Sequence, residues 1–100
     1  MVMPRDYTTY EDLDSALVFD FCKDAWRNLD AEYIALDYQA RSEEEHQMWI
    51  DASIRIRDQF YSQTMNSIED YIEAMKQWDE ERERILAAIE AGDTDIRPLL

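Results

Sequence analysis

The chain has 100 residues with 24 acidic against 10 basic side chains, and its 46% hydrophobic content excludes a disordered acidic tail. One glycine and two prolines are too few for an all-β fold, and they exclude glycine-rich phosphate loops and dinucleotide fingerprints. A single cysteine excludes an internal disulfide, and a single histidine excludes most zinc sites.

The N-terminal part of the chain predicts a short lead-in followed by a helix. Residues 1–8 contain Pro4 and no helical pattern, so we expect them to be extended. Thr8 and Glu11 have the spacing of a capping box, and this predicts a helix over about 9–28. Its apolar residues recur every four positions and include Leu13, Leu17, Phe21, Ala25 and Leu29.

The end of this helix is open on sequence grounds. Asn28 and Asp30 are cap-forming residue types, which predicts a break over 28–31. The 3–4 spacing of apolar residues nevertheless continues across the break, so one helix running on to Arg41 is the alternative. Ser42 with Glu45 repeats the capping-box spacing and is the better boundary.

The next helix has two adjacent apolar stripes, one of them with Trp49, Ala52, Ile56 and Phe60. Two stripes indicate a central helix that touches neighbours on more than one side. Cap-forming residues at 63–67 predict another break, although the apolar rhythm again continues through it.

The last helix is expected over about 67–91, with Gly92 in the position of a C-terminal cap. Residues 93–100 have no helical period, but their apolar side chains could dock on the helices. Together the patterns predict an all-α fold: a single acidic domain over 1–100, built as a small bundle of three or four helices with a long C-terminal helix.

The sequence offers little that would support catalysis. Glu43 and His46 have the Glu-x-x-His spacing of di-iron bundles, but one histidine cannot complete such a site within one chain. Cys22 lies among apolar residues with no histidine beside it to generate a thiolate, so a buried small residue is the better interpretation. We expect no enzyme activity, no metal and no cofactor.

The net charge of −14 indicates what the surface attracts and repels. It disfavours direct binding to nucleic acid and to anionic membranes, and it favours basic protein partners. No apolar run reaches the ~20 residues of a membrane span, and the first residues lack a signal-peptide core, so we expect a cytoplasmic protein.

Acidic residues one helical turn apart approximate a row of phosphates, because a turn of about 5.4 Å is comparable to the spacing of phosphates along a strand. Lys76, Arg82 and Arg84 interrupt this row in the last helix. The candidate partner-binding residues are Asp20, Asp24, Glu69, Asp70, Glu73, Asp79, Glu80 and Glu83.

In size, charge and lack of catalytic motifs, the chain resembles phage proteins that block restriction or CRISPR enzymes, and other DNA mimics. The resemblance implies an inhibitor that occupies the basic groove of a nucleic-acid enzyme. Immunity proteins and antitoxins that neutralise basic nucleases obey the same physics and stay open as alternatives.

The alternative function is a helical assembly subunit whose charge serves only solubility. The long last helix has more apolar length than a small bundle needs, which predicts self-association, most simply as a homodimer. The residues expected to form that contact are Ile68, Ile72, Met75 and Trp78.

Overall fold

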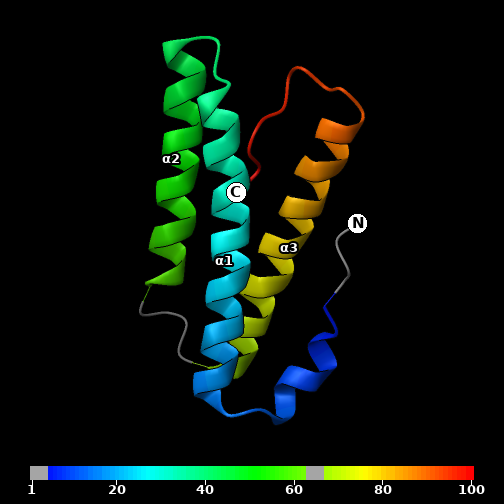
Figure 1. Cartoon of the computed structure of the whole chain (residues 1–100). Coiled ribbons are helices and arrows are strands. Elements are labelled where there is room, and N and C mark those ends of the chain that lie inside the picture. The colour runs from blue at the N-terminus through cyan, green and yellow to red at the C-terminus, as the bar shows by residue number, and fades with distance from the viewer. Residues whose placement is uncertain (1–4, 63–66) are drawn as a thin grey trace.

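The computed structural model describes residues 5–62 and 67–100, and it confirms the all-α prediction (Figure 1). A short 3-10 helix, η1 (Tyr7–Asp12), precedes three α-helices: α1 (Ser15–Tyr38), α2 (Glu43–Phe60) and α3 (Ile68–Glu90). The described residues contain no β-strand. No helix in this part of the chain is long and apolar enough to cross a membrane.

The three long helices run up, down and up, with α1 in the middle (Figure 1). Both major helix contacts, with α2 and with α3, are made by α1. The prediction that the helix with two apolar stripes is central is therefore wrong: α2 is an outer helix. Its second stripe stays partly at the surface, where Ile54 is exposed.

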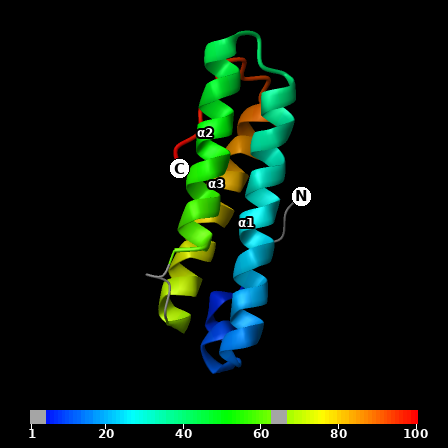
Figure 2. The same cartoon turned by 90° about the vertical axis from the view of Figure 1, so that its left-hand side faces the viewer.

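The arrangement is flat. Its principal extents are 44 × 29 × 15 Å, and its radius of gyration of 14.3 Å exceeds the ~13 Å expected for 100 residues. Figure 2, turned by 90°, shows α2 in front of the other two helices and the C-terminal tail (residues 93–100, red) folding back beside it.

The N-terminal boundary differs from the prediction. Asp6, and not Thr8, caps η1, because its carboxylate accepts a hydrogen bond from the Thr8 backbone N–H over 3.1 Å. The long helix starts only at Ser15, where the Asp14 carboxylate accepts from the Ala16 N–H over 2.8 Å. Two aspartates thus satisfy N–H groups that the following turns leave free. The extended lead-in is wrong at residues 7–8, which belong to η1, and residues 1–4 lie outside the described residues.

The break over 28–31 does not form, because α1 is continuous from Ser15 to Tyr38. Leu29 and Tyr33 are fully buried on one stripe, so unwinding here would expose both. The side chain of Asp30, a cap-forming type, instead accepts a hydrogen bond from Ser53 of α2.

The boundary at Ser42 is confirmed: its hydroxyl accepts from the Glu45 N–H over 3.1 Å and caps α2. The Ser67 hydroxyl caps α3 in the same way, while 63–66 lie outside the described residues. The predicted C-terminal cap at Gly92 is also confirmed. The Gly92 N–H donates to the Ile89 carbonyl, and the Gly92 φ of 76° lets the Asp93 N–H reach the Ala88 carbonyl, which completes a Schellman motif.

The core lies along the α1 stripe and is covered by one side of α2 and α3. Trp49 and Trp78 are buried, and the Trp78 indole N–H donates to Gln59 Oε1 over 3.3 Å. Aromatic rings link the lower ends of the three helices, as in the stacked pair Trp26 and Phe60, whose centroids lie 4.9 Å apart. This contact area replaces water with close-packed side chains over most of the length of α1.

The core also accounts for the stripe expected to mediate self-association. Ile72, Met75 and Trp78 are buried within the chain, and Ile68 is partly buried against the same cluster. The expectation that this stripe lacks cover in one chain therefore does not hold. α1 and η1 pack against α3 and bury this stripe, which the sequence did not predict.

Candidate functional site

The outer side of α3 is an acidic face, which we define as Glu69, Glu73, Glu80 and Glu83. All four side chains are exposed, and within the described part of the chain none of them forms an ion pair. At 100° per residue they point away from the stripe of Met75, Trp78 and Ile85 that packs inward. The sequence predicted these four positions, and the structure brings them onto one side of one helix.

Of the three cations that interrupt the acidic row in the sequence, Lys76 and Arg84 contact groups outside the acidic face. The Lys76 ammonium lies over the Tyr7 ring, 5.5 Å from its centroid. Arg84 turns to Glu81, with Nε 2.6 Å from Oε1, and the Nε atom of Arg82 is buried. The Lys76 and Arg84 side chains are thus directed to η1 and to Glu81, and neither forms an ion pair with the acidic face.

Asp79 does not belong to this face. Its carboxylate is mostly buried and accepts from Arg5 Nε over 2.7 Å and from the Tyr7 hydroxyl over 2.6 Å. Burial, together with the hydrogen bond to Asp79, raises the pKa of Tyr7. Asp79 thus anchors the N-terminal segment to α3, and its predicted role as a free partner-binding charge is corrected.

The remaining predicted acids lie elsewhere on the surface. Asp70 is exposed in the first turn of α3, where the helix dipole favours a negative charge. Asp20 and Asp24 are exposed on α1, on the side opposite its buried residues Val18 and Cys22. The candidate set therefore divides between two helices, and α3 carries the larger group.

One acid that the sequence analysis missed is the most buried charge among the described residues. Glu81 is 4% exposed and accepts hydrogen bonds from the Tyr33 hydroxyl (2.7 Å), Arg84 Nε (2.6 Å) and the Leu99 N–H (2.6 Å). Burial alone would raise its pKa, but the three donors outweigh burial and hold the pKa of Glu81 below the ordinary value. Glu81 follows Trp78 by three residues and precedes Ile85 by four, so helical spacing places it on their buried side. This spacing is the sequence signal that could have predicted its burial.

Glu81 also fixes the C-terminal tail. Besides the Leu99 N–H, three tail carbonyls accept from arginines: Thr94 from Arg41 (2.9 Å), Arg97 from Arg84 (2.6 Å) and Leu100 from Arg55 (3.1 Å). We call Arg41, Arg55, Glu81 and Arg84 the tail-binding surface. Ile96 and Leu100 of the tail pack against the core, so the prediction that its apolar side chains dock holds for these two.

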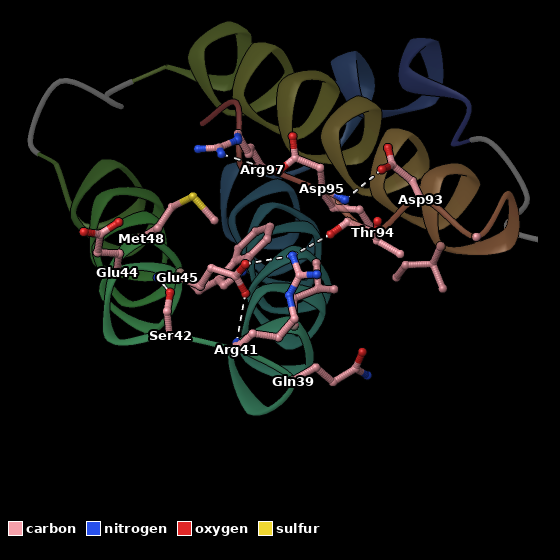
Figure 3. Close-up of a pocket in the computed structure, with 15 residues that line it drawn as sticks. Gln39, Arg41, Ser42, Glu44, Glu45, Met48, Asp93, Thr94, Asp95 and Arg97 are labelled. Atoms are coloured by element: carbon pink, nitrogen blue, oxygen red, sulfur yellow. Dashed lines mark hydrogen bonds and ion pairs between the residues drawn. The ribbon is translucent and has the colours of Figure 1, made fainter.

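A pocket of about 480 Å³ lies beneath the first half of the tail (Figure 3). Its lining combines tail residues 93–97 with Leu36, Met48 and Trp49 from α1 and α2. Glu45 stands at its edge and binds Arg41 through both the Arg41 N–H and the guanidinium, each over 2.9 Å (Figure 3).

The histidine and the cysteine lie far apart in the fold. His46 Nδ1 lies 2.5 Å from Asp37 Oδ1 at the exposed connection between α1 and α2, away from Cys22 in the core. Burial raises the pKa of Cys22 to about 12, which keeps it a thiol. Among the described residues, no group of three His, Cys, Asp or Glu side chains is arranged to hold a metal ion.

Comparison with family models, with curated proteins and with solved structures finds no match to this chain.

Proposed function

We propose that this chain is a non-enzymatic acidic binding protein that inhibits a basic, nucleic-acid-binding target by occupying its groove in the cytoplasm. The inhibitors that phages use against restriction and CRISPR enzymes are of this kind. The observation that carries the proposal is the acidic face of α3, where folding leaves Glu69, Glu73, Glu80 and Glu83 exposed while Lys76 and Arg84 turn to other partners.

The spacing of the acidic face suits a groove that binds phosphates. At about 1.5 Å per residue, Glu69 and Glu73 are separated by about 6 Å along the axis, and the whole face spans about 21 Å. A DNA strand places a phosphate every ~3.4 Å along the axis, so the same length of groove spans about six phosphates. Arginines and lysines spaced for phosphates would therefore find carboxylates within reach.

The overall charge favours a protein target over nucleic acid itself. With 14 net negative charges over 6664 Å² of surface, the chain has about one per 480 Å², and it repels polyanions at long range. The same negative field attracts a protein with a basic groove, and this attraction accelerates association.

The test is a matched pair of charge reversals. Glu69→Lys, Glu73→Lys and Glu80→Lys together change the formal charge of the acidic face from −4 to +2. The control, Glu43→Lys, Asp51→Lys and Asp58→Lys, changes the net charge equally at exposed positions of α2, off this face. Affinity capture from the native host identifies the target, and displacement of a labelled duplex from it, followed by fluorescence anisotropy, measures inhibition.

We expect the wild-type chain and the control to displace the duplex, and the α3 reversal to lose at least tenfold in affinity with unchanged circular dichroism. Equal loss in both variants would show that only net charge matters. No loss in either variant, or a retained partner with no nucleic-acid-binding activity, would refute the proposal.

A second candidate function is self-association as a homodimer. One observation favours it, at a surface of α1 and not at the predicted stripe of α3. Ile34 and Tyr38 lie one turn apart on α1, and their side chains are 41% and 87% exposed. Adjacent exposed apolar side chains are typical of contact surfaces. Sedimentation at micromolar concentration showing a dimer that Ile34→Glu dissolves supports this candidate, and a single 12 kDa species removes it.

A further inference from the structure

The C-terminal tail is held almost entirely through its main chain. Arg41, Arg84 and Arg55 donate to three tail carbonyls, and Glu81 accepts one tail N–H. None of these four hydrogen bonds involves a tail side chain. Ile96 and Leu100 pack their side chains against the core, while Leu99 between them is 70% exposed.

The tail forms no helix or strand, and it follows a glycine in the left-handed conformation. Residues 95–100 form neither helix nor turn. The tail leaves α3 at Gly92, whose φ of 76° reverses the chain, and an added Cβ there would meet no atom within 4 Å. The segment is therefore bound to the helices as an extended peptide ligand would be.

The tail also fits its surface incompletely. The pocket of about 480 Å³ lies between its first half and the apolar side chains of Leu36, Met48 and Trp49. Among the tail residues that line this hollow, Ile96 is apolar, whereas Asp93, Thr94, Asp95 and Arg97 are polar or charged (Figure 3). A segment with a large apolar side chain at one of these polar positions would gain contact area that the tail does not provide.

We propose that the tail-binding surface and the pocket form a binding site for an extended peptide segment of a partner protein, and that the C-terminal tail occupies this site in cis. The partner segment has apolar side chains at two positions four residues apart, matching Ile96 and Leu100. It also has a large apolar side chain two residues before the first of them, which enters the pocket. This site is separate from the acidic face, so its test is independent of the proposed function.

The experiment uses the full chain and a fluorescent peptide with the sequence of residues 93–100. Ile96→Asp with Leu100→Asp undocks the tail by placing charges where the wild-type side chains pack on the core. Leu99→Asp is the matched control, because its side chain faces solvent. Fluorescence anisotropy measures peptide binding to the wild-type chain, the undocked variant and the control.

We expect the undocked variant to bind the peptide at least about tenfold more tightly than the wild-type chain and the control, in which the tethered tail competes at an effective concentration in the millimolar range. A second peptide, with phenylalanine at the Thr94 position, should bind more tightly than the first. Failure of the undocked but folded variant to bind either peptide would overturn the proposal. Equal affinity of the two peptides would overturn the claim that a partner can displace the tail.

Hydrogen exchange on the wild-type chain tests the same proposal without any substitution, which matters if the undocked variant does not fold. A tail that opens on its own exposes the Leu99 amide at a lower free energy than the amides of the α3 core, such as that of Trp78. Exchange of both amides only through global unfolding would show that the tail is an inseparable part of the core, and it would overturn the proposal.

Discussion

The Tyr33 hydroxyl donates a 2.7 Å hydrogen bond to Glu81 Oε2, and this contact joins α1 to α3 across 48 residues of sequence. It is buried, and it places a carboxylate in the core of a chain that otherwise exposes most of its acids. The same carboxylate holds Arg84 and the Leu99 N–H, so one side chain connects two helices and the tail.

Replacing either partner of this contact should lower the free energy of unfolding. Tyr33→Phe removes a hydrogen bond to a charged group and should cost about 1.5–3 kcal/mol. Glu81→Ala leaves Arg84 without its partner and two further donors unsatisfied, and should cost about 3–5 kcal/mol. Urea unfolding measures both, and Tyr38→Phe at an exposed hydroxyl is the control that should change nothing.

The contribution of Glu81 to stability should depend on pH in a defined direction. Its pKa is held below the ordinary 4.5 in the folded state, so the stabilisation is complete above about pH 4.5 and is lost as the pH falls through the folded value. The difference in unfolding free energy between the wild-type chain and Glu81→Gln should therefore shrink below pH 4.5. A difference that stays constant from pH 7 to pH 3 would contradict this assignment.

Cys22 should be unreactive while the chain is folded. Burial raises its pKa to about 12, so almost no thiolate forms at pH 8, and the side chain is inaccessible. Iodoacetamide followed by mass spectrometry should show no modification of the native protein and complete modification in concentrated guanidinium. Rapid labelling of the native chain would mean that α1 opens locally.

Gly92→Ala should destabilise the chain through the backbone alone. The added methyl group meets no neighbour, but a φ of 76° costs an L-residue about 1–2 kcal/mol. Gly92→Asn should cost less, because asparagine tolerates this conformation better. Thermal unfolding of the two variants compares them directly.

Binding to a basic target should weaken steeply with salt if the acidic face mediates it. The Debye length falls from ~10 Å at 0.1 M to ~3 Å at 1 M, so exposed charge pairs are largely screened at the higher concentration. We expect the association rate to fall and the dissociation rate to change much less. Rates from surface plasmon resonance at several salt concentrations measure both, and salt-independent association would point to an apolar contact instead.

The sequence predicted those parts of the fold that local chemistry determines. Ser42 and Gly92 act as caps because their own side chain or backbone freedom satisfies nearby groups, and such signals are visible in a few adjacent residues. The break at 28–31 was wrong because the burial of Leu29 and Tyr33, a tertiary effect, overrides the cap preference of Asn28 and Asp30.

The candidate site was predictable only in part for the same reason. Glu69, Glu73, Glu80 and Glu83 follow from helical spacing, and they are exposed together. Asp79 looks equivalent to them in the sequence, yet Arg5 and Tyr7, more than 70 residues earlier, take up its charge. Contacts at that separation have no local signature, and neither has the approach of Leu99 to Glu81.

The flat, one-layer order of the helices has a consequence for how much of the molecule can meet a partner at once. A plate with extents of 44 × 29 × 15 Å presents broad sides larger than the ~800 Å² that each protein contributes to a standard interface. A more spherical protein of equal mass has a smaller surface area facing any one direction. A chain of only 100 residues can therefore span the full width of a much larger protein's cleft while its thin dimension still fits between the walls.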